Sequence, residues 1–386
     1  SIIGGNHHSL VGATLLNGFL VTAVTMCDVH RPTATHVMPE VMSPALAIAE
    51  RDSLSGRNLL VALTVGCETT TRIAIGLDYP EFRRRGFHGP GVVGPFGAAA
   101  AVGRLLGFDP ETMARAFGLA GSQAAGTFAA LRTPTVKFHQ CRGALSGLLA
   151  ALLAQQGFVA TREFLTAPDG GLFHSYSNGG CPEAVTRGLG EHWEMEEIAL
   201  RLWPCAAALQ SISTAMFDLV EVHGLDLDRT KHVRIFVGQE AFDRYAGFLK
   251  QPKGKFQALM SLYYIAAAIL QDRELSLAQF EPARYSDPKL TRFAADQIEV
   301  TLDSAFSDVQ ARVVAETIDG STFAVQCNNP KGSPENPLAR TEIEGKFRTY
   351  AKTRLPDARV EEAIGLVARL EDLGSTRRLM DILRAV

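Results

Sequence analysis

Apolar residues recur every three or four positions from residue 9 to about residue 160, which is the spacing of helices that bury one face. Glycine-rich or polar stretches interrupt this pattern, and Asp109-Pro110-Glu111 has the composition of a helix start. The helices that we predict cover residues 9–24, 44–54, 58–77, 92–108, 111–126 and 143–158. Because these segments are apolar nearly all round, we expect them to pack inside a large bundle or against a second subunit.

The pattern changes near residue 195, after which apolar and polar residues alternate in short segments. The segments that we predict to be strands are 232–238, 296–303 and 311–327. The last of these is divided by Asp319-Gly320, a pair typical of a two-residue hairpin turn. A helix is predicted over residues 256–272, and the last fifty residues return to an amphipathic helical pattern.

These patterns predict a mainly α protein with two domains. The first is a large all-helical bundle domain formed by residues 1–196 and 335–386, and the second is a smaller α+β lid domain formed by residues 197–334. A chain of 386 residues is long enough for two cores. A cleft between two domains is the usual place for a ligand, so we expect the active site there.

Composition narrows the classes of function. The net charge of −3 gives no reason to expect the concentrated basic face that nucleic acid binding requires, so we expect no nucleic acid partner. No run of apolar residues reaches about 18 positions without a charged residue, so we expect no membrane span. The first residues do not resemble a signal peptide. The six cysteines are scattered without CxxC spacing and are expected to be reduced. We therefore expect a cytoplasmic protein.

The polar segment Met26–Val41 holds Asp28, His30 and His36 between two apolar runs. Histidines and a carboxylate are metal ligands, but this spacing matches no helix face and no typical metal motif, so we expect no metal. Two interpretations stay open. These side chains could cap helices, or they could bind a substrate and move protons, since imidazole titrates near neutral pH.

Two further segments combine cations with histidines. In residues 83–94 three arginines, Arg85 among them, precede His88 and a glycine-rich helix start, which would suit a carboxylate. In residues 132–147 Lys137 and His139 lie just before an apolar helix, where a lysine in a dry cleft can act as a base or bind a carboxylate. Solvated surface residues would give the same patterns.

The second half of the chain offers two weaker candidates. Arg201, in residues 200–210, could form a two-pronged contact with a carboxylate. Tyr263 or Tyr264 could donate a proton or a hydrogen bond. On spacing alone, both segments are equally typical of a protein core.

Taken in order, these segments resemble the MmgE/PrpD family, which includes 2-methylcitrate dehydratases, cis-aconitate decarboxylases and iminodisuccinate epimerase. The resemblance covers nearly the whole chain. The motifs that carry it are the Asp…His loop at 28–36, Gly66–Glu68 followed by Arg72, "GFH" and the glycines at 86–101, "AGSQAAG" at 120–126, Lys137 with the glycines up to 147, "WPC" at 203–205, "SLYY" at 261–264 and "KF" at 346–347.

The resemblance implies a helical domain with an α+β lid, a homodimer, and an active site between the domains that uses no metal or organic cofactor. The substrate would be a small di- or tricarboxylate. By motif, the implied catalytic residues are His36, His88, Lys137 and Tyr264. The substrate-binding residues that we expect are Asp28, Arg201 and Gln210 from the family pattern, with His30 and Arg85 added from the polar segments described above. The chain begins later than family members do, so we expect the family's N-terminal helices to be absent from it.

Departures from the family pattern shape the expected reaction. The family's lid lysine is Arg201 here, and arginine is a poor proton donor. A family histidine is Gln210, which cannot act as an acid, and the usual "HPG" reads His36-Val37-Met38. Epimerisation needs only a base on each face of one carbon. We therefore expect an epimerase of an amino- or imino-dicarboxylate, with a hydro-lyase of the 2-methylcitrate type as the alternative and an inactive binding protein as a third possibility.

Overall fold

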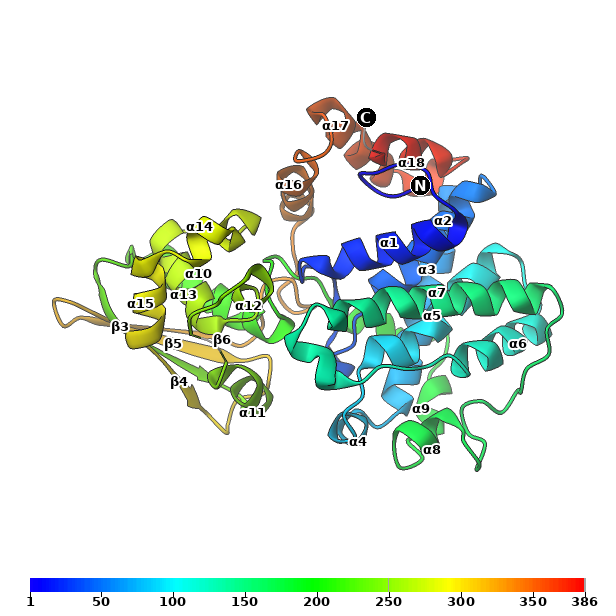
Figure 1. The fold of residues 1–386 in the computed structure, drawn as a ribbon, viewed down its shortest axis with the longest axis horizontal. Coiled ribbons are helices and arrows are strands. Elements are labelled where there is room, and N and C mark those ends of the chain that lie inside the picture. The colour runs from blue at the N-terminus through cyan, green and yellow to red at the C-terminus, as the bar shows by residue number, and fades with distance from the viewer. Residues whose placement is uncertain (249, 385–386) are drawn as a thin grey trace. The chain divides into compact units, whose positions relative to one another are not determined.

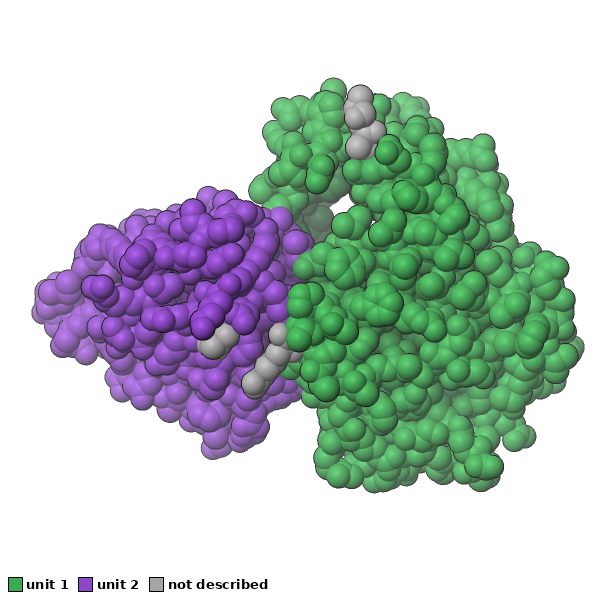
Figure 2. Space-filling model, in the orientation of Figure 1, with its two compact units in different colours: residues 1–23, 27–199, 339–386 green, residues 24–26, 200–338 purple. Residues whose placement is uncertain are grey.

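The computed structural model describes residues 1–248 and 250–384. The chain forms two compact units (Figure 2). Unit 1 contains residues 1–23, 27–199 and 339–386, and unit 2 contains residues 24–26 and 200–338. The short segment 24–26, which follows the first helix, belongs to unit 2 although the sequence places it within the helical region. Each unit is described by itself.

Unit 1 is helical, as predicted. Its helices are α1 (Leu10–Ala23), α2 (Met38–Arg51), α3 (Gly56–Gly76), α4 (Tyr79–Arg84), α5 (Gly89–Leu105), α6 (Pro110–Gly121), α7 (Thr135–Gln155), α8 (Leu172–Tyr176), α9 (Pro182–Thr186), α16 (Arg340–Ala351), α17 (Asp357–Val367) and α18 (Arg377–Leu383). The central helix α5 packs against α2, α3, α6 and α7, and α1 lies along α7 (Figure 1). Two residues of β1 (Val29–His30) pair antiparallel with β2 (Ile198–Ala199).

Several helices begin earlier than predicted, α2 and α7 by the widest margins. Helix α2 begins at Met38, because Pro39 suits a first turn and the carboxylate of Asp28 accepts from the main-chain N–H groups of Val37 and Met38. Pro44, where we predicted the start, lies inside the helix. Helix α7 begins at Thr135, so Lys137 lies in its first turn rather than in a preceding loop.

Glycines allow α3 and α5 to approach closely. A Cβ atom at Gly97 would lie 1.8 Å from the Oγ1 atom of Thr70 and 2.5 Å from the carbonyl oxygen of Gly66. Gly66 would in turn place a Cβ 2.8 Å from the carbonyl oxygen of Gly97. No side chain fits at either position, which explains the small residues of the predicted helices.

Helix α3 is long and apolar enough to cross a membrane by length and composition, which the sequence analysis did not anticipate. Most of its apolar window is buried inside unit 1. It also carries Glu68 and Arg72, which form a buried ion pair. These are the properties of a core helix in unit 1.

The C-terminal segment completes the core of unit 1. One hydrophobic cluster joins side chains of α2 and α3, including Val41 and Leu59, to nine buried residues of the C-terminal segment: Leu355, Val360, Ala363, Leu366, Leu370, Leu379, Met380, Ile382 and Leu383. A second cluster joins α5, α6, α7 and α8 around Phe96, whose ring stacks on Phe164 with the centroids 5.1 Å apart. Residues far apart in the sequence therefore share one domain core.

Unit 2 is an α+β unit with a four-stranded sheet. The strands are β3 (Thr230–Val237), β4 (Ile298–Leu302), β5 (Ala311–Thr317) and β6 (Thr322–Cys327), in the order β4-β3-β5-β6. Only the β3–β4 pair is parallel. The predicted hairpin is confirmed, and Gly320 has a φ of +86° in its turn. The turn holds three residues, 318–320, rather than the predicted two, because the N–H of Thr317 donates to the carbonyl oxygen of Ser321.

Six α-helices accompany the sheet in the described part of unit 2. They are α10 (Gln210–His223), α11 (Gln239–Ala241), α12 (Lys255–Ala258), α13 (Leu262–Asp272), α14 (Pro282–Tyr285) and α15 (Pro288–Asp296), with a π-helical turn at Phe242–Ala246. Helix α10 packs on β5, β6 and α13. The mainly α fold is thus confirmed, whereas the role of unit 2 as a lid stays a prediction.

Candidate active site

Asp28 and His36 form one hydrogen-bonded unit before α2. The two oxygens of the Asp28 carboxylate accept from the N–H groups of Val37 and Met38, at 3.0 and 3.1 Å. The carbonyl oxygen of Asp28 lies 2.6 Å from Nδ1 of His36. A carbonyl can only accept, so Nδ1 carries a hydrogen, and in the neutral form of the ring Nε2 keeps its lone pair. Asp28 therefore positions His36, and its side chain is occupied by α2.

His30 is fully buried and both of its ring nitrogens have partners. Nδ1 lies 2.8 Å from Oγ1 of Thr33, and Nε2 lies 3.1 Å from Oε1 of Glu194. This hydrogen bond is also the largest cause that lowers the pKa of Glu194. His30 thus joins the loop before α2 to the segment around Glu194, and its predicted contact with substrate stays a prediction.

His88 lies at the N-terminus of α5 and faces a second histidine. Its Nδ1 atom is 3.0 Å from Nδ1 of His139, which lies in α7. Burial lowers the pKa of His88 well below its usual range, and repulsion from His36, His139, Lys137 and Arg83 in their charged forms lowers it further. Burial also lowers the pKa of His139. We therefore expect both rings to be neutral at pH 7.

Three of the predicted catalytic residues thus share one electrostatic neighbourhood in unit 1. Lys137 is 5% exposed, in the first turn of α7, and its charge acts on His88 together with that of His36. Because a neutral His88 meets nearby cations, the group suits an anionic substrate.

Arg83, rather than the predicted Arg85, belongs to this neighbourhood. Its guanidinium lies over the ring of Phe128, 3.4 Å from the centroid, and donates to the carbonyl oxygen of Phe87 at 2.9 Å. Arg85 instead donates to the carboxylate of Glu81 and to the segment 174–178. The run of three arginines could not show which one turns toward His88.

The buried ion pair between Glu68 and Arg72 holds the segment that contains Glu194, the partner of His30. Arg72 donates to the carboxylate of Glu68 and to the carbonyl oxygens of Arg187 and His192, at 2.8 and 2.6 Å. Glu68 also accepts from the N–H groups of Glu194 and Met195, at 3.1 and 2.9 Å. Both residues belong to the motifs behind the family resemblance, and here they hold the segment 187–195 against α3.

Glu40, which the sequence analysis did not single out, is a fully buried carboxyl in the first turn of α2. Neither carboxylate oxygen has a hydrogen-bond partner within the described part of the chain. Gly94 of α5 and Gly143 of α7 make room for it, since a Cβ at either position would lie 2.5 or 3.3 Å from its Cγ atom. Burial raises the pKa of Glu40 well above its usual range, and the charge of Asp28 raises it further.

The substitution Glu40→Met should therefore stabilise the protein by roughly 1–3 kcal/mol at pH 8, the cost of an unpaired buried polar group. The folded state holds the proton more tightly than the unfolded state, so wild-type stability falls as pH rises above about 4.3, the unfolded pKa. The gain should shrink toward pH 5. Urea unfolding at both pH values would measure it, with the exposed Glu163→Met as control. An equal pH dependence in Glu40→Met and wild type would contradict this account.

In unit 2, Gln210 and Arg201 organise the segment 203–205. Oε1 of Gln210 accepts from the N–H of Trp203 at 3.3 Å, and its Nε2 donates to the carbonyl oxygens of Trp203 and Cys205 at 3.0 and 3.3 Å. Arg201 is 2% exposed and donates to the carbonyl oxygen of Cys205 at 3.5 Å. The amide of Gln210 is thus engaged by the main chain, and the predicted substrate contacts of both residues stay predictions.

Tyr264 lies inside the core of unit 2. It is fully buried, its hydroxyl donates to the carbonyl oxygen of Gln279, and its ring centroid is 6.0 Å from that of Phe280. Burial raises the pKa of its hydroxyl. These are the contacts of a core tyrosine, and the catalytic role of Tyr264 stays a prediction.

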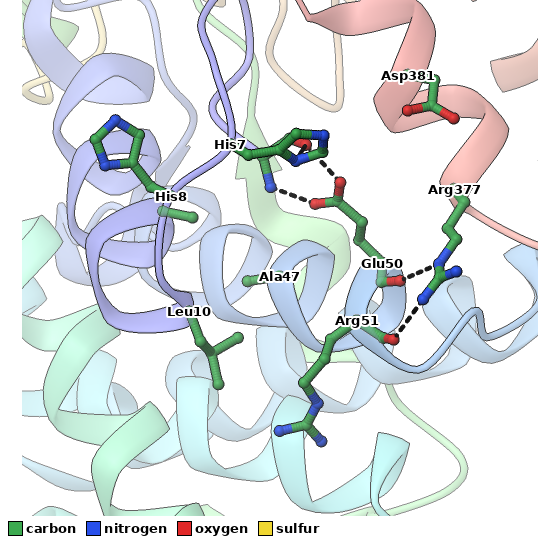
Figure 3. A pocket seen from close by; sticks show the side chains of 10 residues that line it. His7, His8, Leu10, Ala47, Glu50, Arg51, Arg377 and Asp381 are labelled. Atoms are coloured by element: carbon green, nitrogen blue, oxygen red, sulfur yellow. Dashed lines mark hydrogen bonds and ion pairs between the residues drawn. The ribbon is translucent and has the colours of Figure 1, made fainter.

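A separate cavity of about 510 Å³ in unit 1 is lined by His7, His8, Glu50, Arg51, Arg377 and Asp381, among others (Figure 3). Arg377 donates to the carbonyl oxygens of Glu50 and Arg51 at the end of α2, both at 3.0 Å. None of the predicted site residues lines this cavity. Across residues 1–248 and 250–384, no three His, Cys, Asp or Glu side chains are placed to hold a metal ion.

Comparison with known proteins agrees with the resemblance. The MmgE/PrpD N-terminal domain matches residues 1–184, and the MmgE/PrpD C-terminal domain matches residues 203–372. The cis-aconitate decarboxylase-like protein oryM of Aspergillus oryzae is 30% identical over 99% of this chain and 84% of its own length. The cis-aconitate decarboxylases of Aspergillus terreus and Homo sapiens are 28% and 26% identical, over 97% and 96% of this chain and 81% and 79% of their own lengths. The chain therefore belongs to the MmgE/PrpD family.

Proposed function

We propose that this protein is a carboxy-lyase that releases CO₂ from a small tricarboxylate of the cis-aconitate type. The observation that carries the proposal is the grouping of His36, His88 and Lys137 in one neighbourhood of unit 1, with Arg83 beside His88. The relatives are named as cis-aconitate decarboxylases or decarboxylase-like, which favours decarboxylation. The departures from the family pattern at Arg201 and Gln210 had favoured epimerisation instead. The epimerase and the hydro-lyase remain as alternatives that the experiment below separates.

In this proposal, Lys137 and Arg83 bind substrate carboxylates and stabilise the negative charge that develops. Breaking the C–C bond leaves its electron pair on carbon as CO₂ departs, and a second carboxylate or a double bond spreads that charge. The carbanion then takes one proton. The overall reaction, R–COO⁻ + H⁺ → R–H + CO₂, consumes one proton in each turnover.

Two imidazoles have the states that proton transfer requires. Nε2 of His36 holds a lone pair, because Nδ1 donates to the carbonyl of Asp28. His88 is a buried neutral ring among cations, so it can give the hydrogen of one ring nitrogen to the carbanion. Asp28 acts through His36 as a positioning residue, and His30 is kept as a proposed substrate contact. Arg201, Gln210 and Tyr264 are kept as proposed contributions from unit 2, and a homodimer and a cytoplasmic location are likewise proposed.

NMR of candidate di- and tricarboxylates in D₂O tests the proposal in a single assay. We expect loss of CO₂ from cis-aconitate, with one solvent deuterium in the product and no change after treatment with a chelator. Deuterium exchange without loss of CO₂ or water would instead identify an epimerase, and loss of water would identify a hydro-lyase. Unchanged substrates throughout would overturn the proposal and favour a binding protein.

A further inference from the structure

His139 is the titratable group nearest to the proposed catalytic histidine that the mechanism above does not use. Its Nδ1 atom lies 3.0 Å from Nδ1 of His88. At this distance one nitrogen must donate and the other accept, so a single hydrogen lies between the two rings. The tautomer of His88 is therefore coupled to that of His139.

The surroundings hold this pair in place. The main-chain N–H of His88 donates to the carbonyl oxygen of Gly126 at 3.1 Å. A Cβ at Gly126 would lie 3.2 Å from Nδ1 of His139, so this residue packs against both histidines. Phe128 meets the ring of His88 edge-on, with the centroids 5.4 Å apart. The two imidazoles cannot slide past one another without moving these contacts.

The two rings differ in their access to solvent. His88 is 6% exposed, whereas His139 is only partly buried and follows Phe138, which is 47% exposed. The charged and titratable groups that act on His88 are Arg83 from the end of α4, His36 from the loop before α2, and Lys137 and His139 from α7. All four side chains are cationic or can become so, and a direct route for a proton past them is electrostatically unfavourable.

We propose that His139 is a positioning residue that relays a proton from solvent to His88 during decarboxylation. This inference rests on the proposed function. In the resting pair, His88 carries hydrogen on Nε2, and Nδ1 of His139 donates to Nδ1 of His88. His88 gives its Nε2 hydrogen to the substrate carbanion, forming the C–H bond. Its Nδ1 takes the hydrogen of His139, and Nε2 of His139 takes one proton from water.

Both rings are neutral before and after this step, in keeping with their burial. After the product leaves, Nε2 of His88 takes a proton from water, the shared hydrogen returns to His139, and Nε2 of His139 releases its proton. The net consumption is one proton for each CO₂, as the reaction requires. The relay lets a buried imidazole act as an acid without becoming a cation beside Lys137 and Arg83.

The variant His139→Asn tests the relay because an asparagine amide can still donate to Nδ1 of His88 but cannot pass a proton on. We expect kcat for CO₂ release to fall on the order of 10²-fold, with KM and melting temperature unchanged. The dependence of the rate on the D₂O fraction should be curved in wild type, where two protons move together, and linear in the variant. A small imidazole should partly rescue His139→Ala. Wild-type kcat and curvature in His139→Asn would overturn the relay.

Tautomer measurements separate failure of the relay from failure of the proposed function. ¹⁵N NMR of histidine-labelled protein needs no substrate. It should show His88 protonated at Nε2 and His139 at Nδ1 in wild type, and a changed mixture for His88 in His139→Leu. If the protein decarboxylates but these tautomers are absent, the relay is wrong. If the tautomers are present but no tested carboxylate reacts, the proposed function is wrong and the relay falls with it.

Discussion

The substitution His88→Gln should lower kcat for decarboxylation by roughly 10²–10⁴-fold, which is the usual contribution of a positioned acid or base. His88 is the group on which the cations of this neighbourhood act and the one that faces His139. Glutamine keeps a polar side chain at the start of α5, so the helix should persist, but it cannot hold a transferable proton.

Steady-state release of CO₂ and a melting curve on the same samples would measure the effect on His88→Gln. The matched control is His174→Gln, an exposed histidine of α8 in the same unit, which should keep wild-type kcat. A His88→Gln enzyme with kcat near that of wild type would remove His88 from the catalytic machinery. A variant that melts early would be replaced by His88→Asn before any conclusion is drawn.

Breaking the Glu68–Arg72 pair should cause the largest loss of stability, roughly 3–5 kcal/mol for Glu68→Met. Both side chains are nearly buried, at 7% and 5% exposed. Removing Glu68 leaves the Arg72 guanidinium without its carboxylate, and it leaves the N–H groups of Glu194 and Met195 without an acceptor. The expected loss of stability comes from burying these groups without partners, and not only from losing the attraction between the two charges.

Urea unfolding would compare Glu68→Met with a surface pair on the neighbouring helix. Arg84 is 71% exposed where it pairs with Glu81, so Arg84→Met should cost less than about 1 kcal/mol. The double variant Glu68→Met/Arg72→Met should be less destabilised than the sum of its single changes, since it removes both charges together. Additive losses in this cycle would show that the two side chains act separately.

The helices of unit 1 were predictable because an apolar period of three to four residues records burial directly. Their boundaries were less so. The start of α2 depends on the carboxylate of Asp28, ten residues before Met38, and no local pattern shows that contact. The two-residue pairing of β1 with β2 joins Val29 to Ala199, which is likewise invisible along the sequence. The hairpin at Asp319-Gly320 was predictable because its turn chemistry is local.

The residues of the candidate site that lie in the family motifs could be predicted from the sequence. These motifs gave His36, His88 and Lys137, and the first and last of these act electrostatically on His88. They could not give the pairing of His88 with His139, because that contact joins two helices. They also could not show that the Glu40 carboxyl, between glycines of α5 and α7, has no hydrogen-bond partner among the described residues, since a glutamate in a helix start usually faces solvent.

The order in which the chain is synthesised has a consequence for how it can fold. Residues 200–338 form nearly all of unit 2 without interruption, so that unit can fold as soon as it leaves the ribosome. Unit 1 cannot complete its fold until the C-terminal segment has been synthesised, because residues 355–383 complete the hydrophobic cluster on α2 and α3. A messenger cut short after residue 338 would therefore yield a folded unit 2 attached to a bundle with one apolar face open. Such a product would be a substrate for chaperones and proteases rather than a partial enzyme.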